Sequence, residues 1–253
     1  MFNQTLSFNS LSREINMRGT GIFSVVLCLV IFPRFPSGNS EPRLAPALYV
    51  LGDSLFDSGN NNFLPTLARA DFQPYGVNFP GGATGRFTNG RTVADFIVVT
   101  LFFLSFLVSL LVGAFFGGLK IAEFLGLPMS PPFMSFQNSR TLTGLNYASG
   151  SCGILPETGN YIGKCLNLDD QIGLFGKTVK NELTKHLGSS EVLSDYLSKS
   201  IFLVSTGNND YINNYLQPNL YDSSSRYSPR SFAQLLTDSL SHKLSLTPLS
   251  LSL

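Results

Sequence analysis

Two short apolar runs, each followed directly by a polar loop, stand out in the pattern of hydrophobic positions along the chain. The first covers residues 47–51 and leads into Gly52-Asp53-Ser54, and the second covers residues 201–205 and leads into residues 206–211. Continuous apolar runs of this length, bounded by turn residues, are typical of strands that are buried on both faces of a parallel sheet. Polar loops that follow parallel strands meet at one edge of the sheet, where ligands bind. The pattern therefore predicts an α/β fold with its chemistry after these two strands.

Helical periodicity appears in three segments after residue 165. Residues 168–175 and 181–186 are amphipathic, and Gly188 is a suitable end for the second of them. Residues 231–243 place Phe232, Leu235, Leu236 and Leu240 on one face. Strands that alternate with helices of this kind favour a parallel sheet covered by helices.

A longer apolar segment interrupts this pattern, because residues 96–119 contain no charged side chain. A run of about 20 apolar residues is long enough to cross a membrane. When residues 98–121 are left out, however, Val93, Phe96, Ile97, Phe124 and Leu125 fall on one face of a single helix. We therefore interpret residues 98–121 as an apolar insert, and a translated intron is our explanation for it. The alternative is a real membrane span over residues 96–119, and sequencing of the spliced transcript separates the two.

The N-terminal 40 residues have the features of a secretory signal peptide. Arg13 and Arg18 precede an apolar run at residues 22–32, and small and polar residues follow at 36–40. A basic flank, a short apolar run and a small-residue exit are typical of a cleaved signal, and the run is short for a membrane span. We expect residues 1–40 to be removed and the protein to be secreted, and the alternative is an N-terminal membrane anchor.

Composition limits the remaining classes of function. The chain has 253 residues, which suits one α/β domain with additional segments, and its formal net charge is +1. A nearly neutral chain offers no basic face, so we expect no nucleic-acid partner. Charged residues make up only 13% of the chain, and the two apolar segments account for much of that deficit.

The cysteines predict a disulfide in the mature chain. Cys28 falls in the expected signal peptide, which leaves Cys152 and Cys165 as a pair in an oxidising compartment. The alternative is that both are small buried hydrophobic side chains. Neither is part of a CxxC motif or has a histidine nearby, so we expect no metal site.

Three sequence blocks carry the candidate chemistry. They are Gly-Asp-Ser-Leu-Phe-Asp-Ser-Gly-Asn-Asn-Asn at 52–62, Gly-Leu-Asn-Tyr-Ala-Ser-Gly at 144–150 and Gly-Asn-Asn-Asp-Tyr at 207–211. In this order they resemble the plant GDSL esterase/lipase family of the SGNH hydrolase superfamily, over roughly residues 47–244 apart from the insert. The resemblance implies a three-layer α/β/α fold with a flavodoxin-like parallel sheet. It also implies hydrolysis of carboxylic esters, including lipid or other small acyl esters, through an acyl-enzyme and without a cofactor.

The same resemblance implies roles for three residues. Ser54 matches the nucleophilic serine, Gly150 the glycine whose backbone N–H holds the oxyanion, and Asn209 the asparagine whose amide donates to the same oxygen. A strand-end serine suits nucleophilic attack, and fixed N–H donors stabilise the developing charge. The alternatives are a helix-capping serine and a simple turn glycine. We expect Asp53, Asp57 and Asn60 to brace the loop rather than to react.

The general base is the component that the sequence does not supply. The family places it in an Asp-x-x-His block near the C-terminus. His186 has a leucine three positions before it, and Asp238 precedes His242 by four positions. We therefore expect a partial hydrolase domain at residues 41–244, with its C-terminal part missing, a tail outside the family at 245–253, and impaired activity. The alternatives are an inactive secreted remnant with a binding or regulatory role, and a membrane-tethered protein.

Overall fold

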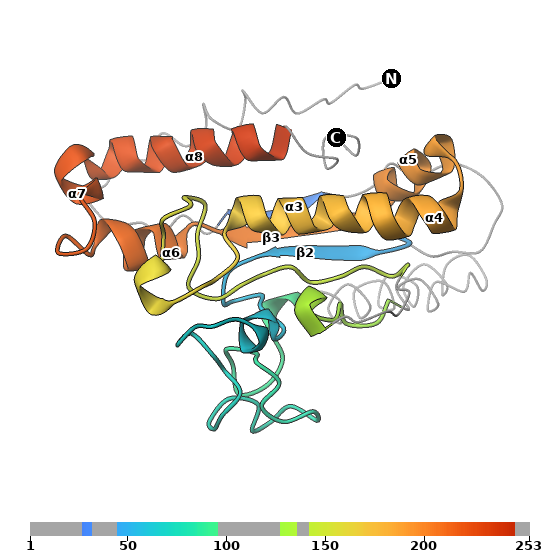
Figure 1. The fold of residues 1–253 in the computed structure, drawn as a ribbon, viewed down its shortest axis with the longest axis horizontal. Coiled ribbons are helices and arrows are strands. Elements are labelled where there is room, and N and C mark those ends of the chain that lie inside the picture. Colours follow the sequence, from blue (N-terminus) through green and yellow to red (C-terminus); the bar gives the residue numbers. More distant parts are fainter. Residues whose placement is uncertain (1–26, 32–44, 96–126, 136–141, 246–253) are drawn as a thin grey trace, which may run out of the picture.

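The computed structural model describes residues 27–31, 45–95, 127–135 and 142–245 (Figure 1). The apolar insert at 98–121, the alternative membrane span at 96–119 and most of the tail at 245–253 lie outside the described residues. No helix among the described residues has the length and apolar character needed to cross a membrane.

A three-stranded sheet forms the centre of the fold. Its strands are β1 (Leu27–Ile31), β2 (Leu48–Gly52) and β3 (Ile201–Thr206), in the order β1-β3-β2. The two apolar runs pair in parallel as expected, from Leu48 opposite Ile201 to Gly52 opposite Ser205.

The third strand is antiparallel, so the sheet is mixed rather than purely parallel. Residues 27–31 of β1 pair with β3 in the opposite direction, with Leu27 opposite Thr206. This strand lies within residues 1–40, which we expect to be a cleaved signal peptide, and that expectation stays a prediction. The same short apolar run is typical both of a signal peptide and of a strand.

The helices follow the sequence pattern closely. The longer ones are α3 (Leu168–Thr178), α5 (Ser190–Ser198) and α8 (Pro229–Ser245). The shorter ones are α4 (Thr184–Leu187), α6 (Asn208–Asp210) and α7 (Ser223–Arg226), with π-helical turns η4 (Val179–Leu183) and η5 (Tyr211–Tyr215). Three 3-10 turns are η1 (Asn60–Phe63), η2 (Phe133–Ser135) and η3 (Asn160–Ile162). The two helices expected at 168–175 and 181–186 form one continuous run through α3, η4 and α4.

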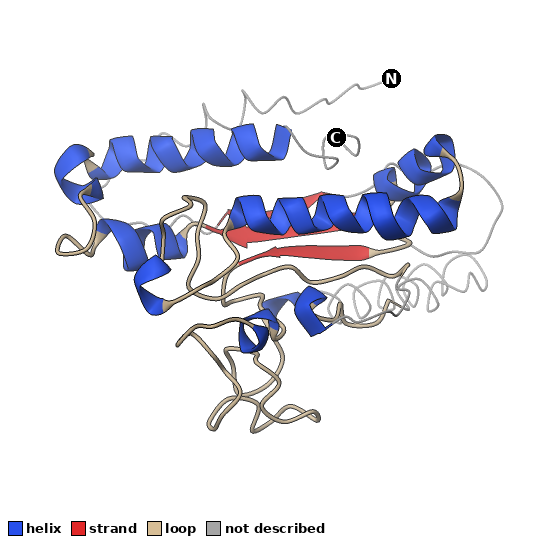
Figure 2. Cartoon of the chain, in the orientation of Figure 1, coloured by secondary structure: helices blue, strands red, loops and turns tan. Residues whose placement is uncertain are grey.

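The long helices lie on one side of the sheet and a lobe of loops lies on the other (Figure 1). α3 and α8 share the first side. Residues 57–95 form the lobe, which consists almost entirely of irregular structure (Figure 2). Strands, helices and a parallel β2–β3 pair together make this an α/β fold.

Both faces of the sheet are buried, which explains the continuous apolar runs. Tyr49 and Phe202 face a large core that also contains the inward stripe of α8, formed by Phe232, Leu236, Leu240 and Leu244. Val50 and Leu203 face a smaller core with Phe56 and Ala148. A strand buried on both faces has no polar positions to alternate with its apolar ones.

Three aromatic rings form the centre of the larger core. Tyr49 stacks on Phe202 with ring centroids 5.3 Å apart, and Phe175 of α3 meets both rings edge-on, at 5.0 Å and 5.5 Å. The Tyr49 hydroxyl reaches the Tyr196 hydroxyl at 3.1 Å, so the buried polar atom has a partner. These rings join α3 to both parallel strands.

We expect Phe175→Ala to lower the free energy of unfolding by about 3–5 kcal/mol, because truncation of a buried aromatic ring leaves a cavity. Urea denaturation followed by far-UV circular dichroism measures the loss. Lys177→Ala on the exposed side of the same helix is the control. A loss below about 1 kcal/mol for Phe175→Ala would contradict the central position of the ring.

Candidate active site

The end of β2 is pressed against the end of β3 at Gly52. The φ angle of Gly52 is 155°, and a Cβ atom there would lie 2.3 Å from the carbonyl oxygen of Ser205. The backbone N–H of Asp53 donates to the same carbonyl at 3.1 Å. Only glycine fits this contact. Gly52 pairs with Ser205 at the end of the register, so the first and third sequence blocks lie at the same edge of the sheet.

The side chain of Gln171 holds the end of β2 in place. Its Oε1 accepts the N–H of Gly52 at 2.8 Å, and its Nε2 donates to the Gly52 carbonyl at 2.8 Å. The same Nε2 also donates to the carbonyl of Leu166 at 2.8 Å. Gln171 is almost completely buried at the start of α3. The helix therefore fixes the backbone two residues before the nucleophile.

Ser54 lies in a tight turn directly after this clamp. The carbonyl of Asp53 accepts the N–H groups of Phe56 and Asp57 at 3.1 Å and 3.0 Å. Asp53 Oδ1 accepts the N–H of Leu55 at 3.0 Å. Ser54 itself is half-buried, and no described residue hydrogen-bonds its hydroxyl. The turn thus presents the Ser54 oxygen at the sheet edge.

Asp57 and Asn60 hold the loop after Ser54, as the sequence predicted. Asp57 Oδ1 accepts the N–H groups of Gly59 and Asn60 at 2.8 Å and 2.7 Å. Asn60 Nδ2 donates to the carbonyls of Asn146 and Ala148 at 3.0 Å and 2.8 Å. These contacts join the first sequence block to the second.

The N–H of Gly150 donates to Asp57 Oδ2 at 3.1 Å. The oxyanion role expected for Gly150 stays a prediction. An N–H group has one proton to donate, and a buried carboxylate is a strong acceptor for it. Gly150 therefore serves here to orient Asp57.

The next residue, Ser151, differs from Gly150 in its backbone conformation and in the hydrogen bonding of its N–H. In the preceding segment the N–H of Tyr147 donates to Val50, and that of Ser149 donates to Gly52. Ser151 has a φ of 79° and its N–H has no acceptor among the described residues. A non-glycine residue in this conformation is uncommon and often marks a functional site.

Asn209 is held next to Ser151 by two amide contacts. Its Nδ2 donates to the carbonyl of Cys152 at 2.9 Å, and its Oδ1 accepts from Asn213 Nδ2 at 3.2 Å. Asn213 Nδ2 also donates to the carbonyl of Ser151 at 3.1 Å. An amide NH₂ group has two protons, so Asn209 keeps one after its bond to Cys152. The second and third sequence blocks are thereby fixed to each other.

Asp210 closes the loop around the site. Its two carboxylate oxygens accept from the N–H groups of Ile154 and Leu155, at 2.8 Å and 3.0 Å, and from the Thr158 hydroxyl at 2.7 Å. The adjoining Cys152 forms a disulfide with Cys165. This loop is consequently fixed by one covalent and three polar contacts.

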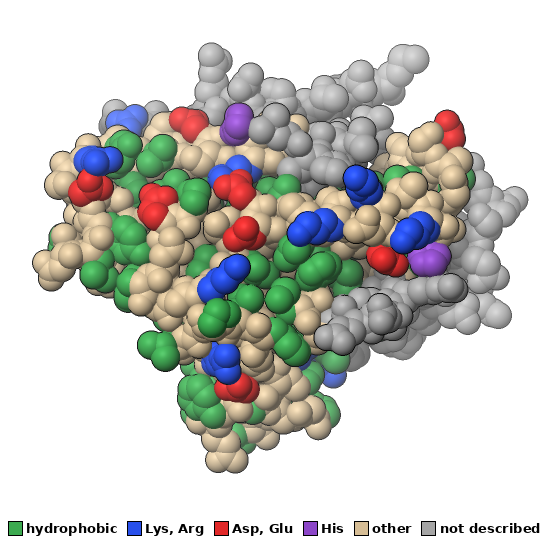
Figure 3. All heavy atoms as spheres, in the orientation of Figure 1, with side chains coloured by type: hydrophobic (Ala, Val, Ile, Leu, Met, Phe, Trp, Pro, Cys, Tyr) green, Lys and Arg blue, Asp and Glu red, His purple; other side chains and the backbone are tan. Residues whose placement is uncertain are grey.

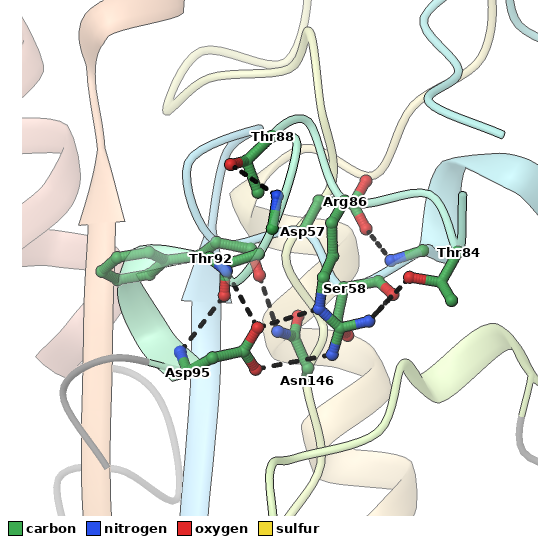
Figure 4. Close-up of polar contacts among 11 residues, drawn as sticks. Asp57, Ser58, Thr84, Arg86, Thr88, Thr92, Asp95 and Asn146 are labelled. Atoms are coloured by element: carbon green, nitrogen blue, oxygen red, sulfur yellow. Dashed lines mark hydrogen bonds and ion pairs between the residues drawn. The ribbon is translucent and has the colours of Figure 1, made fainter. Parts of the chain in front are cut away.

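A buried ion pair attaches the loop lobe to the nucleophile loop (Figure 4). Arg86 Nε lies 2.8 Å from Asp95 Oδ2, and both side chains are buried. The same guanidinium donates to the Ser58 carbonyl at 3.3 Å and to the Thr84 hydroxyl at 2.9 Å. Sequence reasoning missed this pair, because neither residue stands in a recognisable motif.

Neither histidine lies in a position to activate Ser54. His186 is on α4, at the opposite end of the sheet from α6, and lies 3.9 Å from Glu182 (Figure 1). His242 is exposed in the last turn of α8. Among the described residues there is also no cluster of three metal-binding side chains. On the face drawn in Figure 3, acidic and basic side chains are interspersed.

Asp53 is the one carboxyl group of the site with an unpartnered oxygen. Its Oδ2 is buried and has no hydrogen-bond partner. Burial raises the pKa of Asp53 from 3.8 to about 6, and the neighbouring Asp210 carboxylate adds to the rise against the opposing Leu55 N–H. A protonated Asp53 avoids the cost of an unpaired buried charge.

We expect this carboxyl group to make stability depend on pH. Because its pKa is higher in the folded protein than in the unfolded chain, the folded state binds the proton more tightly. Its contribution is present near pH 4 and is lost as the pH rises through about 6. Asp53→Asn should match the parent at about pH 4 and exceed its free energy of unfolding by roughly 1–3 kcal/mol at about pH 8. Urea denaturation at both pH values measures the difference, and a variant that is equally stable or less stable at the higher pH would contradict it.

Comparisons with known proteins identify the same family as the three sequence blocks. A family model described as GDSL-like Lipase/Acylhydrolase matches residues 48–245. The chain is 42% identical over 228 residues to GDSL esterase/lipase 7 of Arabidopsis thaliana. This alignment covers 88% of the chain and 56% of that protein. It is 43% identical over 213 residues to GDSL esterase/lipase At5g08460 of Arabidopsis thaliana. This second alignment covers 82% of the chain and 49% of that protein.

The chain thus spans about half the length of the curated relatives that it matches. No solved structure matches it. The family model covers most of the chain, including the parallel strand pair and all three sequence blocks. The chain therefore belongs to the GDSL-like lipase/acylhydrolase family.

Proposed function

We propose that this protein is a serine hydrolase that cleaves carboxylic esters, of lipids or of smaller acyl compounds, through an acyl-enzyme on Ser54. The observation that supports this function is the convergence of the three sequence blocks around one serine. Ser54 lies at the end of β2, Asn209 follows the adjacent β3, and Asn213 joins Asn209 to Ser151. The curated relatives bear the name esterase/lipase, in agreement with this proposal.

The chemistry begins when Ser54 Oγ attacks the ester carbonyl carbon. A new C–O bond forms, the hydroxyl proton passes to a base, and the carbonyl oxygen becomes an oxyanion. The tetrahedral intermediate then expels the alcohol, which takes up a proton, and leaves the acyl group on Ser54. Water attacks this acyl-enzyme in the same way and releases the carboxylic acid.

The oxyanion receives two donors in our proposal. One is the remaining amide N–H of Asn209, and the other is the backbone N–H of Ser151, next to the Gly150 that sequence reasoning favoured. Gly150 contributes by orienting Asp57. Removal of one such donor typically costs about 3–4 kcal/mol of transition-state stabilisation.

The base is the incomplete part of this mechanism. The described residues place no histidine beside Ser54, so the proton goes to water or to a group outside them. Loss of the base from a serine site still leaves catalysis by the oxyanion donors, at a rate about 10³–10⁴ above that in water. We therefore expect slow turnover of p-nitrophenyl esters by this chain.

We also propose that the protein is secreted. A disulfide such as Cys152–Cys165 forms and persists mainly in oxidising compartments, and the N-terminal segment has the pattern of a signal peptide. One second candidate function is a secreted protein that binds acyl compounds without hydrolysing them, because no histidine among the described residues lies beside Ser54.

We expect a fluorophosphonate probe to label Ser54 slowly, because phosphonylation needs a positioned serine and oxyanion donors but no deacylation, and no base among the described residues takes the hydroxyl proton. Ser54→Ala should abolish the label, and Asn209→Ala should slow labelling by about 100-fold. Intact-mass spectrometry and peptide mapping measure the extent and position of the label.

Ser58→Ala is the matched control, because Ser58 lies in the same loop and its buried hydroxyl makes no hydrogen bond. It should label at the parental rate. Labelling that persists in Ser54→Ala, or a folded and disulfide-bonded parent that never reacts, would rule out the proposed hydrolase and favour the binding protein.

A further inference from the structure

An open cleft lies between the loop that follows η5 and the short helix α7, at the left edge of Figure 1. Its volume is about 530 Å³, which is within the range of roughly 300–1,000 Å³ that is typical of small-molecule sites. Its lining lies outside the three sequence blocks and has no role in the proposed hydrolysis. The lining residues are Pro218, Asn219, Leu220, Tyr221, Asp222, Ser224 and Ser225.

The interior of the protein holds this loop in one shape. The Ser223 hydroxyl donates to Asn214 Oδ1 at 2.6 Å, and Asn214 Nδ2 donates to the Thr158 hydroxyl at 3.2 Å. Asn214 is completely buried. Within the loop, the backbone N–H of Tyr221 donates to the carbonyl of Gln217 at 2.9 Å. A cleft whose walls are fixed before a ligand enters loses less entropy on binding.

Tyr221 supplies an aromatic ring that is itself held in place. Its hydroxyl donates to the carbonyl of Glu157 at 3.0 Å, and its ring meets the ring of Tyr161 edge-on, with centroids 6.2 Å apart. Tyr221 is half-buried, so part of the side chain remains open to a ligand. An aromatic ring offers a large apolar surface at a small entropic cost, and here the orientation of the ring is already set.

Two polar side chains of the cleft are free to bind a ligand. Asn219 and Ser224 are both exposed, and no described residue hydrogen-bonds the Asn219 amide or the Ser224 hydroxyl. An amide side chain has two N–H donors and an acceptor oxygen, and a hydroxyl both donates and accepts. The cleft therefore presents donors and acceptors close to an aromatic ring.

The charge in the cleft is compensated. Asp222 is the only charged residue of the described lining, and its Oδ2 lies 2.6 Å from Arg226 Nη2. An anionic ligand would need a free cationic side chain, which the described lining does not contain. A long hydrocarbon chain would need an apolar lining, whereas most of these side chains are polar. The cleft consequently suits a ligand that is polar and uncharged.

We propose that this cleft binds a neutral saccharide, as a short oligosaccharide or as the end of a longer chain. A pyranose ring has an apolar face of C–H groups and a rim of hydroxyl groups that both donate and accept. In the proposed complex the C–H face packs against Tyr221, and the hydroxyl rim binds Asn219 and Ser224. Binding of this kind does not depend on the proposed ester hydrolysis.

NMR titration of the full chain with cellobiose, xylobiose and maltose tests the proposal. At least one of these neutral disaccharides should cause saturable shifts of the backbone amide signals of Asn219, Tyr221 and Ser224. The expected Kd is on the order of 1 mM, because the cleft is open and shallow contacts bind weakly. Ser54→Ala should bind the disaccharide equally well, which separates this inference from the proposed function.

Matched variants test the ring and the amide separately. Tyr221→Ala removes the ring and should weaken binding at least about tenfold. Tyr221→Phe keeps the ring and removes only the hydroxyl that Glu157 holds, so it should bind within about twofold of the parent. Asn219→Ala should weaken binding about fivefold. Asn181→Ala, at an exposed asparagine of η4, is the control and should bind as the parent does.

The inference stands if a disaccharide shifts the three amide signals and if Tyr221→Ala and Asn219→Ala both bind it more weakly. It is overturned if none of the three disaccharides causes a saturable shift, or if either variant binds like the parent. It is also overturned if phosphate or butyrate shifts the same signals at lower concentrations than the disaccharides do. Should Tyr221→Ala fail to fold, Asn219→Ala decides the question, because the Asn219 side chain is exposed.

Discussion

The close parallel pairing of β2 with β3 at Gly52 is the constraint on which the rest of the site depends. A side chain at this position would collide with the Ser205 carbonyl, so the two strands approach fully only because residue 52 is glycine. This approach sets the register that pairs Gly52 with Ser205 at the ends of the two strands. Gln171 binds both polar backbone groups of Gly52, which ties the register to the packing of α3.

Buried polar side chains, rather than regular secondary structure, hold the loops that follow the two strands. Asp57 and Asp210 each accept three hydrogen bonds, mainly from backbone N–H groups that would otherwise be buried without a partner. Asp53 is the exception, because its buried Oδ2 has no hydrogen-bond partner. The site thus combines a rigid frame with one unsatisfied polar atom directly before Ser54, and burial raises the pKa of all three carboxyl groups.

These constraints fix part of the proposed catalytic site in place. The candidate nucleophile Ser54 follows β2, and Asn209, a candidate oxyanion donor, follows the adjacent β3. The chain spans about half of its curated relatives. In the proposed reaction the described residues supply the nucleophile and the oxyanion donors, and the general base is not among them.

Local sequence determined the elements and pointed to the candidate nucleophile. The apolar runs of β2 and β3 predicted a buried parallel pair, the stripe along α8 predicted an amphipathic helix, and the block at 52–62 identified Ser54. These features are local, since they depend on composition and spacing within a few residues. Tertiary structure decided the contacts between distant segments, including the antiparallel β1, the Arg86–Asp95 pair and the hydrogen bond from the Gly150 N–H to Asp57. The direction of a backbone N–H depends on its φ angle and on acceptors far away in the sequence, and neither can be read from the residue's own neighbours.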